Sequence, residues 1–124
     1  MTELTPDDCL RAVIGMFPEF EEFWGNEGDI FREGDGSFTY HGLYATFSHY
    51  VRARYRQMSE GEKEEMFRFV ETCLSEGSGS ADAGNAVHTC FIENLAGDLP
   101  LGEVRRYAGA KTVQAFEHYG GGAA

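Results

Sequence analysis

Histidine and cysteine are the residue types in this sequence that bind zinc, but their spacing is not that of a zinc site. The four histidines and three cysteines include no His-Glu-x-x-His and no Cys-x-x-Cys pattern. His88 and Cys90 are two residues apart, so on a helix they point in different directions. The acidic segment 25–37 lacks the ligand register of a calcium loop. We therefore expect no metal and no cofactor.

Nucleophilic catalysis requires a cysteine or serine beside a positioned base, and no recognisable motif for it occurs here. Cys73 and Cys90 fall on the apolar faces of expected helices, where a thiol behaves as a small hydrophobic group. Cys9 lies early in the first expected helix, where partial exposure is expected. The glycine-rich run 77–84 does not follow a strand, as a nucleotide-binding loop must. We expect that the protein is not an enzyme and that its thiols are reduced.

Glu71 and Glu93 are the carboxylates nearest to apolar helix faces. Two facing carboxylates with a nearby histidine in one pocket would suit acid–base catalysis. The favoured alternative is structural, because a glutamate beside a core commonly pairs with arginine or receives the N-terminus of a neighbouring helix. We therefore interpret both residues as parts of the fold.

A run of arginine and tyrosine at 50–56 is the local exception to an acidic sequence. Such a run can grip phosphates and stack on bases. However, Arg52, Arg54 and Arg56 spread around a helix rather than forming one stripe, and they lie in its last turns, where cations suit the helix dipole. We expect them to pair with the acids that follow at 60–65 or with those of the first helices, and we expect no nucleic-acid binding.

The net charge of −11 is unevenly distributed. Residues 1–35 contain ten acidic and two basic side chains, and residues 59–98 contain nine and two. An acidic surface repels nucleic acids and anionic membranes and attracts basic partners. Solubility alone is the alternative explanation of this charge.

The segment 25–37 combines four glycines and four acids with two adjacent apolar residues, Ile30 and Phe31. We expect this segment to be a loop. Apolar side chains in an acidic loop suit an anchor that inserts into a basic cleft. The alternative is that Ile30 and Phe31 fold back onto the core.

Length and composition predict a single folded domain. The chain has 124 residues, of which 42% are hydrophobic and 14% aromatic, and it has no apolar run long enough for a membrane span. Residues 1–119 are expected to form the domain and residues 120–124 a flexible Gly/Ala tail. The acidic N-terminus does not resemble a signal peptide, so we expect a cytoplasmic protein.

Apolar residues at helical spacing predict helices through most of the chain. Thr5 and Ser59 begin two of them as capping residues, and Ser80 is expected to cap another. Pro18 is expected either to kink the first helix or to begin a second short one, with Gly25 as its end. The remaining expected helices span about 38–58, 101–107 and 111–119.

The sequence Phe-Val-Glu-Thr at 69–72 recurs as Phe-Ile-Glu-Asn at 91–94. Stacked helical hairpins would produce this echo, and so would chance. Short loops make sequential helices pack antiparallel. We predict an all-α domain of five to six antiparallel helices, arranged as a bundle or a short helical-repeat array.

Three motifs carry a resemblance to a known family: Phe-Arg-Phe-Val-Glu at 67–71, Cys-Phe-Ile-Glu-Asn-Leu at 90–95 and the helix start Gly-Ala-Lys-Thr at 109–112. Residues 40–119 resemble a family of small all-helical bacterial proteins of uncharacterised biochemistry, which look like immunity proteins of interbacterial toxin systems. The chain departs from that family at Ala110, where proline is frequent. The resemblance implies no catalytic residue, and it implies that Glu71 and Glu93 belong to the fold.

The expected function is therefore that of an immunity protein, or antitoxin, which binds a cognate toxin with a basic cleft and blocks it. Two alternatives stay open: a regulatory or adaptor module without a toxin partner, and a homodimer whose surface the tyrosines mark. No membrane partner is expected. The expected contact residues are Asp29, Phe31, Glu33 and Asp35, with Glu19 and Glu22 as secondary contacts.

Overall fold

The protein is all-α, as predicted. The computed structural model describes residues 4–75 and 81–119, and within them it contains no strand. Because 81–95 runs as one continuous helix, these residues form seven helices where five to six were predicted. The predicted cap at Ser80 and the predicted tail at 120–124 lie outside the described residues.

The elements are α1 (Pro6–Met16), α2 (Phe20–Glu27), the 3-10 helix η1 (Gly28–Phe31), α3 (Tyr40–Arg54), the 3-10 helix η2 (Tyr55–Gln57), α4 (Glu60–Leu74), α5 (Ala81–Ala86), the π-helix η4 (Val87–Ile92), α6 (Glu93–Leu95), α7 (Leu101–Tyr107) and α8 (Ala110–Tyr119).

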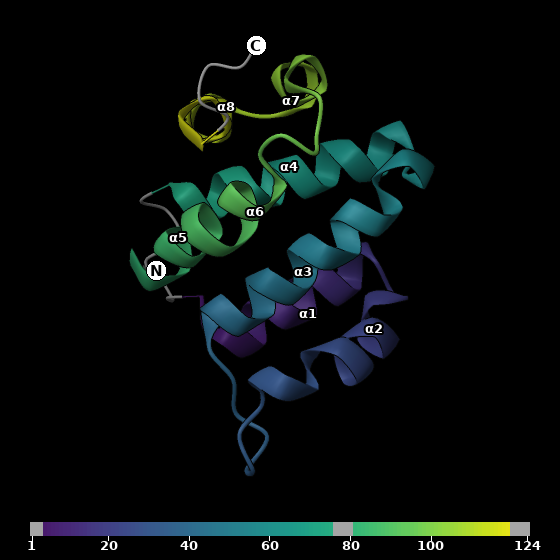
Figure 1. Cartoon of the computed structure of the whole chain (residues 1–124), viewed down its shortest axis with the longest axis vertical. Helices are drawn as coiled ribbons and strands as arrows, with labels where there is room; N and C mark the ends of the chain where they lie inside the picture. Colours follow the sequence, from purple (N-terminus) through teal and green to yellow (C-terminus); the bar gives the residue numbers. More distant parts are fainter. Residues whose placement is uncertain (1–3, 76–80, 120–124) are drawn as a thin grey trace.

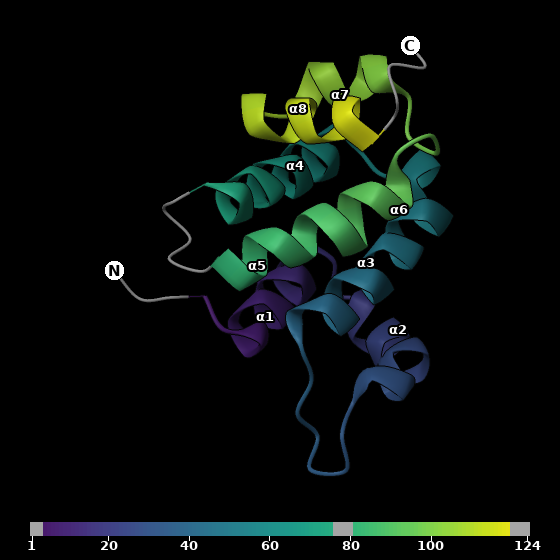
Figure 2. The ribbon, with the colours of Figure 1, turned by 60° about the vertical axis from the view of Figure 1, so that its left-hand side comes forward.

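The helices form a stack with α3 near its middle. Both α1 and α2 contact α3, and the continuous helix α5–η4–α6 also packs along it. Helix α4 lies beside that continuous helix, and α7 and α8 cover α4 at the far end (Figure 2). Figure 1 looks almost along α7 and α8 while α3 and α4 run across the view, so the C-terminal pair crosses the others steeply. The stack therefore places α2 and α7–α8 at opposite ends of the molecule.

Aromatic side chains join α3 to its neighbours. The Phe47 ring is fully buried, and its centroid lies 4.9 Å from that of Phe91 in a stacked pair. Phe17 and Phe20 approach the same ring from the α1–α2 side, with centroid distances of 6.1 and 5.6 Å. Each such pair adds about 0.5–1.5 kcal/mol to the free energy gained by burying its area. Phe47 therefore holds both sides of the stack together.

The predicted helix starts at Thr5 and Ser59 are confirmed. The Thr5 hydroxyl accepts from the Asp8 amide at 3.1 Å, and the Asp8 carboxylate accepts from the Thr5 amide at 3.0 Å. Ser59 and Glu62 form the same reciprocal pair at 3.1 and 2.8 Å. Each capping box satisfies two amides that the first turn of a helix leaves free.

The expected loop at 25–37 is partly wrong, because its first half is helical. Helix α2 continues through Gly25 to Glu27, and η1 follows directly. A glycine inside a helix costs about 1 kcal/mol relative to alanine, which made Gly25 a plausible end. Burial of the preceding residue, Trp24, outweighs that cost: its side chain is 6% exposed and packs against Phe20 and Phe38.

The helix at 81–95 also departs from the regular spacing on which its prediction rested. Its middle, η4, is a π-helix, in which each turn contains an extra residue. Phe91 and Ile92 are buried there, whereas Cys90 is only half-buried. The expectation that Cys90 lies in the core is therefore wrong.

Glu71 receives the N-terminus of α8, which is the structural role preferred from the sequence. One of its carboxylate oxygens accepts from the Thr112 amide at 2.9 Å and from the Thr112 hydroxyl at 2.8 Å, and the other accepts from the Lys111 amide at 3.3 Å. Glu93 is instead exposed on α6, so the two echoed segments occupy different environments. The structure does not bring Glu71 and Glu93 together in one pocket.

Replacing Glu71 by alanine should destabilise the protein by about 1–3 kcal/mol, because it leaves the fully buried Thr112 without its acceptor. Glu71→Gln keeps one acceptor oxygen and should lose less. Urea unfolding followed by circular dichroism measures both, with the exposed Glu93→Ala as the control. Equal stability of Glu71→Ala and Glu93→Ala would contradict the capping role.

Glu103 on α7 should make the stability depend on pH. The Tyr55 hydroxyl donates to Glu103 at 2.9 Å and the Lys63 ammonium does so at 3.1 Å, and these bonds hold the pKa of Glu103 below its ordinary value of 4.5. A lowered pKa means that the carboxylate stabilises the fold above pH 4.5 and that this contribution is lost as the pH falls through the folded-state pKa.

The Glu103→Gln variant should therefore be less stable than wild type at pH 7, by no more than about 1 kcal/mol because the carboxylate is partly exposed. The difference should narrow between pH 5 and pH 3. Thermal unfolding across this range measures it, and Glu93→Gln serves as the control. A constant difference would show that the hydrogen bonds to the Glu103 carboxylate do not carry the effect.

Candidate functional site

The end of the stack opposite α7 and α8 is strongly acidic. It consists of α2, η1 and the turn at 32–37, which projects at the bottom of Figures 1 and 2, and we call this region the acidic tip. Its exposed carboxylates outnumber its single base, Arg32, by six to one. These carboxylates belong to Glu21, Glu22, Glu27, Asp29, Glu33 and Asp35.

Arg32 fixes η1 against the end of α2. Its guanidinium donates to the carbonyl oxygens of Trp24 at 2.8 Å and Gly25 at 3.1 Å, and it pairs with Asp29 at 3.1 Å. It also lies over the Trp24 ring, 5.5 Å from the centroid. A cation at the C-terminus of a helix satisfies free carbonyl groups and suits the dipole. The only base of the acidic tip is therefore used to hold its backbone.

The turn of the tip is closed by its own hydrogen bonds. The Asp35 carboxylate accepts from the Ser37 amide at 2.9 Å and from the Ser37 hydroxyl at 2.7 Å. The Glu33 amide donates to the Ser37 carbonyl at 2.8 Å. The bonds from Ser37 lower the pKa of Asp35, so its carboxylate stays charged at neutral pH. The side chain of Glu33 has no hydrogen bond or ion pair to the described residues and faces solvent.

The two adjacent apolar residues of the tip have different surroundings. Phe31 is half-buried over Gly42 of α3, so closely that a Cβ atom on Gly42 would lie 2.7 Å from the Phe31 Cβ. Ile30 is 83% exposed, and it is the one exposed large hydrophobic side chain in the part of the chain that the structure describes. The sequence-based set of contact residues contained Phe31 and not Ile30. Two neighbours in a helical turn cannot face the same way, but their order alone does not say which one faces the core.

The structure brings four of the six predicted contact residues together and separates Glu19 from them. Asp29, Phe31, Glu33 and Asp35 all lie in η1 and the following turn, and Glu22 is exposed on α2. Glu19 precedes the opposite end of α2, about 12 Å away along an eight-residue helix.

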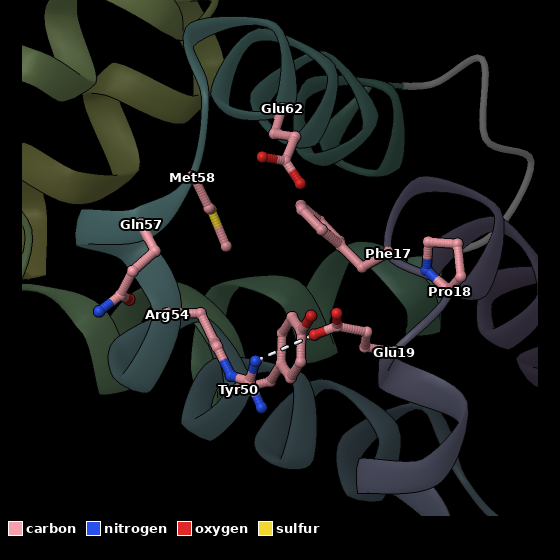
Figure 3. A pocket seen from close by; sticks show the side chains of 8 residues that line it. All are labelled: Phe17, Pro18, Glu19, Tyr50, Arg54, Gln57, Met58 and Glu62. Atoms are coloured by element: carbon pink, nitrogen blue, oxygen red, sulfur yellow. Dashed lines mark hydrogen bonds and ion pairs between the residues drawn. The ribbon is translucent and has the colours of Figure 1, made fainter.

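Glu19 lies at a hollow of about 350 Å³ between the α1–α2 connection, η2 and the start of α4 (Figure 3). Its carboxylate pairs with Arg54 at 3.0 Å, and the Arg54 guanidinium lies 5.3 Å from the centre of the Tyr50 ring. Burial raises the pKa of Tyr50. Figure 3 shows the Glu19–Arg54 pair across the opening, with Phe17 on the other side. Glu19 is thus engaged within the chain, as Asp29 and Asp35 of the tip are, whereas Glu33 of the tip is not.

The arginines of the 50–56 run are largely engaged as well. Arg54 pairs with an acid of the first helices, which is one of the two sets of partners expected from the sequence. Arg52 pairs instead with Asp98 at 2.9 Å and donates to the Asn94 carbonyl. Arg56 is exposed, without a hydrogen bond or ion pair in the described residues.

One known protein family matches most of the chain. The family described as a domain of unknown function (DUF7674) matches residues 10–118, which include the acidic tip and nearly all the helices. The chain belongs to the DUF7674 family. No curated protein and no solved structure matches it.

Two cysteines, Cys73 within the matched residues and Cys9 just before them, are buried together with a tyrosine. Cys9 and Cys73 are 0% and 1% exposed, and the Tyr44 hydroxyl lies 3.3 Å from the Cys73 sulfur. The expectation that Cys9 is partly exposed is therefore wrong, because α1 packs against α3 and α4 along its whole buried face. A hydrogen bond with Cys9, together with burial, raises the pKa of the Cys73 thiol. Burial raises the pKa of Tyr44 as well.

Two further findings concern the part of the chain that the structure describes. Within residues 4–75 and 81–119, no group of three or more His, Cys, Asp or Glu side chains is arranged to hold a metal ion. In the same residues no helix is both long and apolar enough to cross a membrane.

Proposed function

We propose that this chain is an immunity protein, which binds a toxin domain through the acidic tip and blocks the active site of that toxin. The observation that carries the proposal is Ile30, an exposed apolar side chain among the carboxylates of Glu27, Asp29, Glu33 and Asp35. Binding interfaces commonly have an apolar anchor at the centre and a polar rim. The tip supplies both from one short segment.

The rigidity of the tip supports a role in binding. Arg32, the Asp35–Ser37 turn and the contact of Phe31 with Gly42 already fix its backbone. A preorganised segment loses little conformational entropy when a partner binds, so more of the contact energy appears as affinity. Ile30 would therefore enter a partner's pocket without refolding of the loop.

The charge of the tip indicates the chemistry of the partner. Six carboxylates with a single, internally bonded arginine favour a partner surface rich in lysine and arginine. Toxins that act on nucleic acids or nucleotides often have basic clefts, and the resemblance of this sequence to immunity proteins is in line with such a partner. Association would be fast at low salt and slower as the ionic strength rises.

Co-expression with the product of the adjacent gene tests this function. We expect wild type to restore growth and to co-purify with that product. Neutralising Glu27 and Glu33 to glutamine should weaken the complex, whereas the matched change of the exposed Glu64 and Glu65 on α4 should not. A harmless neighbour that forms no complex would favour the regulatory or adaptor module instead.

A further inference from the structure

A thiol and an imidazole face each other between α3 and η4, outside the acidic tip. The Cys90 sulfur lies 3.1 Å from Nδ1 of His41, which is the second residue of α3. Cys90 is half-buried and His41 is exposed, so the pair lies at the edge of the core and not within it. A sequence separation of 49 positions hides the pair from any search for local motifs. It is the nucleophile-and-base arrangement that the sequence did not reveal.

The π-helix is what presents Cys90 to His41. In a regular helix Cys90 would share the buried face of Val87 and Phe91, but the wider turn leaves it at the edge of the core. Local side chains hold this turn: Asn94 donates to the Cys90 carbonyl at 2.7 Å, and Thr89 donates to the Asn85 carbonyl at 3.0 Å. Two carbonyl groups at the π-turn thus have side-chain donors, one of them the carbonyl of Cys90 itself.

We propose that Cys90 is a reactive thiol, activated by His41, which hydrogen peroxide oxidises to a sulfenic acid. With its own proton on Nε2, His41 accepts the thiol proton at Nδ1, and the thiolate is the nucleophile. The sulfur attacks one peroxide oxygen, so that an S–O bond forms and the O–O bond breaks. The leaving hydroxide takes the proton from His41. One thiol and one hydrogen peroxide therefore give one sulfenic acid and one water, with sulfur oxidised and peroxide reduced.

The other two cysteines provide an internal comparison. Cys9 and Cys73 are 0% and 1% exposed, and they lie beside the Tyr44 hydroxyl rather than a histidine. Oxidation of a thiol follows its exposure and its thiolate character, so these two should be protected as long as the protein stays folded. Reaction at Cys90 alone would distinguish an activated thiol from general oxidation of cysteines.

The experiment treats the folded full chain with hydrogen peroxide, traps sulfenic acid with dimedone, and measures the rate of labelling at each cysteine by peptide mass spectrometry. His41→Asn removes the base, and His49→Asn is the matched control, because His49 is an exposed residue of the same helix without a contact to Cys90. We expect labelling of Cys90 in wild type and in His49→Asn, and a rate at least tenfold lower in His41→Asn.

Two results would overturn the proposal. One is an equal rate of Cys90 labelling in wild type and His41→Asn, with both shown to be folded by circular dichroism. The other is a rate of labelling at Cys90 in wild type that is no higher than the rate for N-acetylcysteine under the same conditions. This second comparison uses wild type alone, so it decides the matter even if the His41 variant does not fold.

Discussion

The Ile30→Ala variant should bind the toxin at least 30-fold more weakly than wild type and should unfold at the same temperature. An apolar anchor at the centre of an interface contributes about 2 kcal/mol or more, and each 1.4 kcal/mol corresponds to a factor of ten in affinity. The side chain is 83% exposed in the free protein, so its removal opens no cavity in the core. Isothermal titration calorimetry with the purified adjacent gene product measures the affinity.

A matched control for Ile30→Ala is Leu101→Ala, which truncates an apolar residue of α7 at the opposite end of the stack. This variant should keep the wild-type affinity. Its partly buried side chain predicts a small loss of stability instead. If both variants bind equally well, Ile30 is not the anchor, and the contact surface lies elsewhere on the molecule.

The Phe47→Ala variant should lose about 3–5 kcal/mol of stability, which is the cost of deleting a buried aromatic ring from a core. Phe47 is fully buried between Phe91 on one side and Phe17 and Phe20 on the other. A domain of this size has a free energy of unfolding of about 5–15 kcal/mol in total, so the variant should be close to unfolding. Urea denaturation at 25 °C measures the loss.

Phe47→Leu keeps most of the volume and should lose clearly less than Phe47→Ala. A loss below about 1 kcal/mol in Phe47→Ala would show that the ring does not join the two sides of the stack. Because the acidic tip is attached through α2 and α3, strong destabilisation at Phe47 should also abolish partner binding, whereas Ile30→Ala should weaken binding without a loss of stability.

Helix starts and long amphipathic helices could be predicted from this sequence because their causes are local. Thr5 and Ser59 cap helices through bonds to residues three positions away, and the apolar spacing of 38–58 reports the face that α3 buries. These features depend on neighbours within one turn. The fold class follows from them.

The prediction of a loop at 25–37 was wrong at glycines that allow close packing and do not end a helix. Gly28 looks like a loop residue, but a Cβ atom there would lie 2.3 Å from the Trp24 ring. Glycine is required because η1 passes directly over the indole ring. The conformational preferences of single residues do not predict a contact of this kind. The same holds for Gly42 under Phe31, which decides that Ile30 and not Phe31 faces solvent.

The π-helix is the feature that sequence spacing is least able to predict. Periodicity at 3.6 residues places Cys90 in the core, and one extra residue in the turn moves it beside His41. The carboxylates of Glu71 and Glu93 show the same limit, since both follow an aromatic–aliphatic pair, yet only Glu71 meets the start of another helix. A tertiary contact distinguishes Glu71 from Glu93, and side-chain bonds to the backbone hold the π-turn.

Amide hydrogen exchange of the chain, alone and in the complex that co-purifies with the adjacent gene product, tests the role of the acidic tip most directly. We predict that binding slows exchange in α2, η1 and the turn at 32–37, because a bound partner covers these amides. Exchange in α7 and α8, at the other end of the stack, should stay unchanged. Protection confined to α7 and α8, or no change at the tip, would contradict binding through the acidic tip.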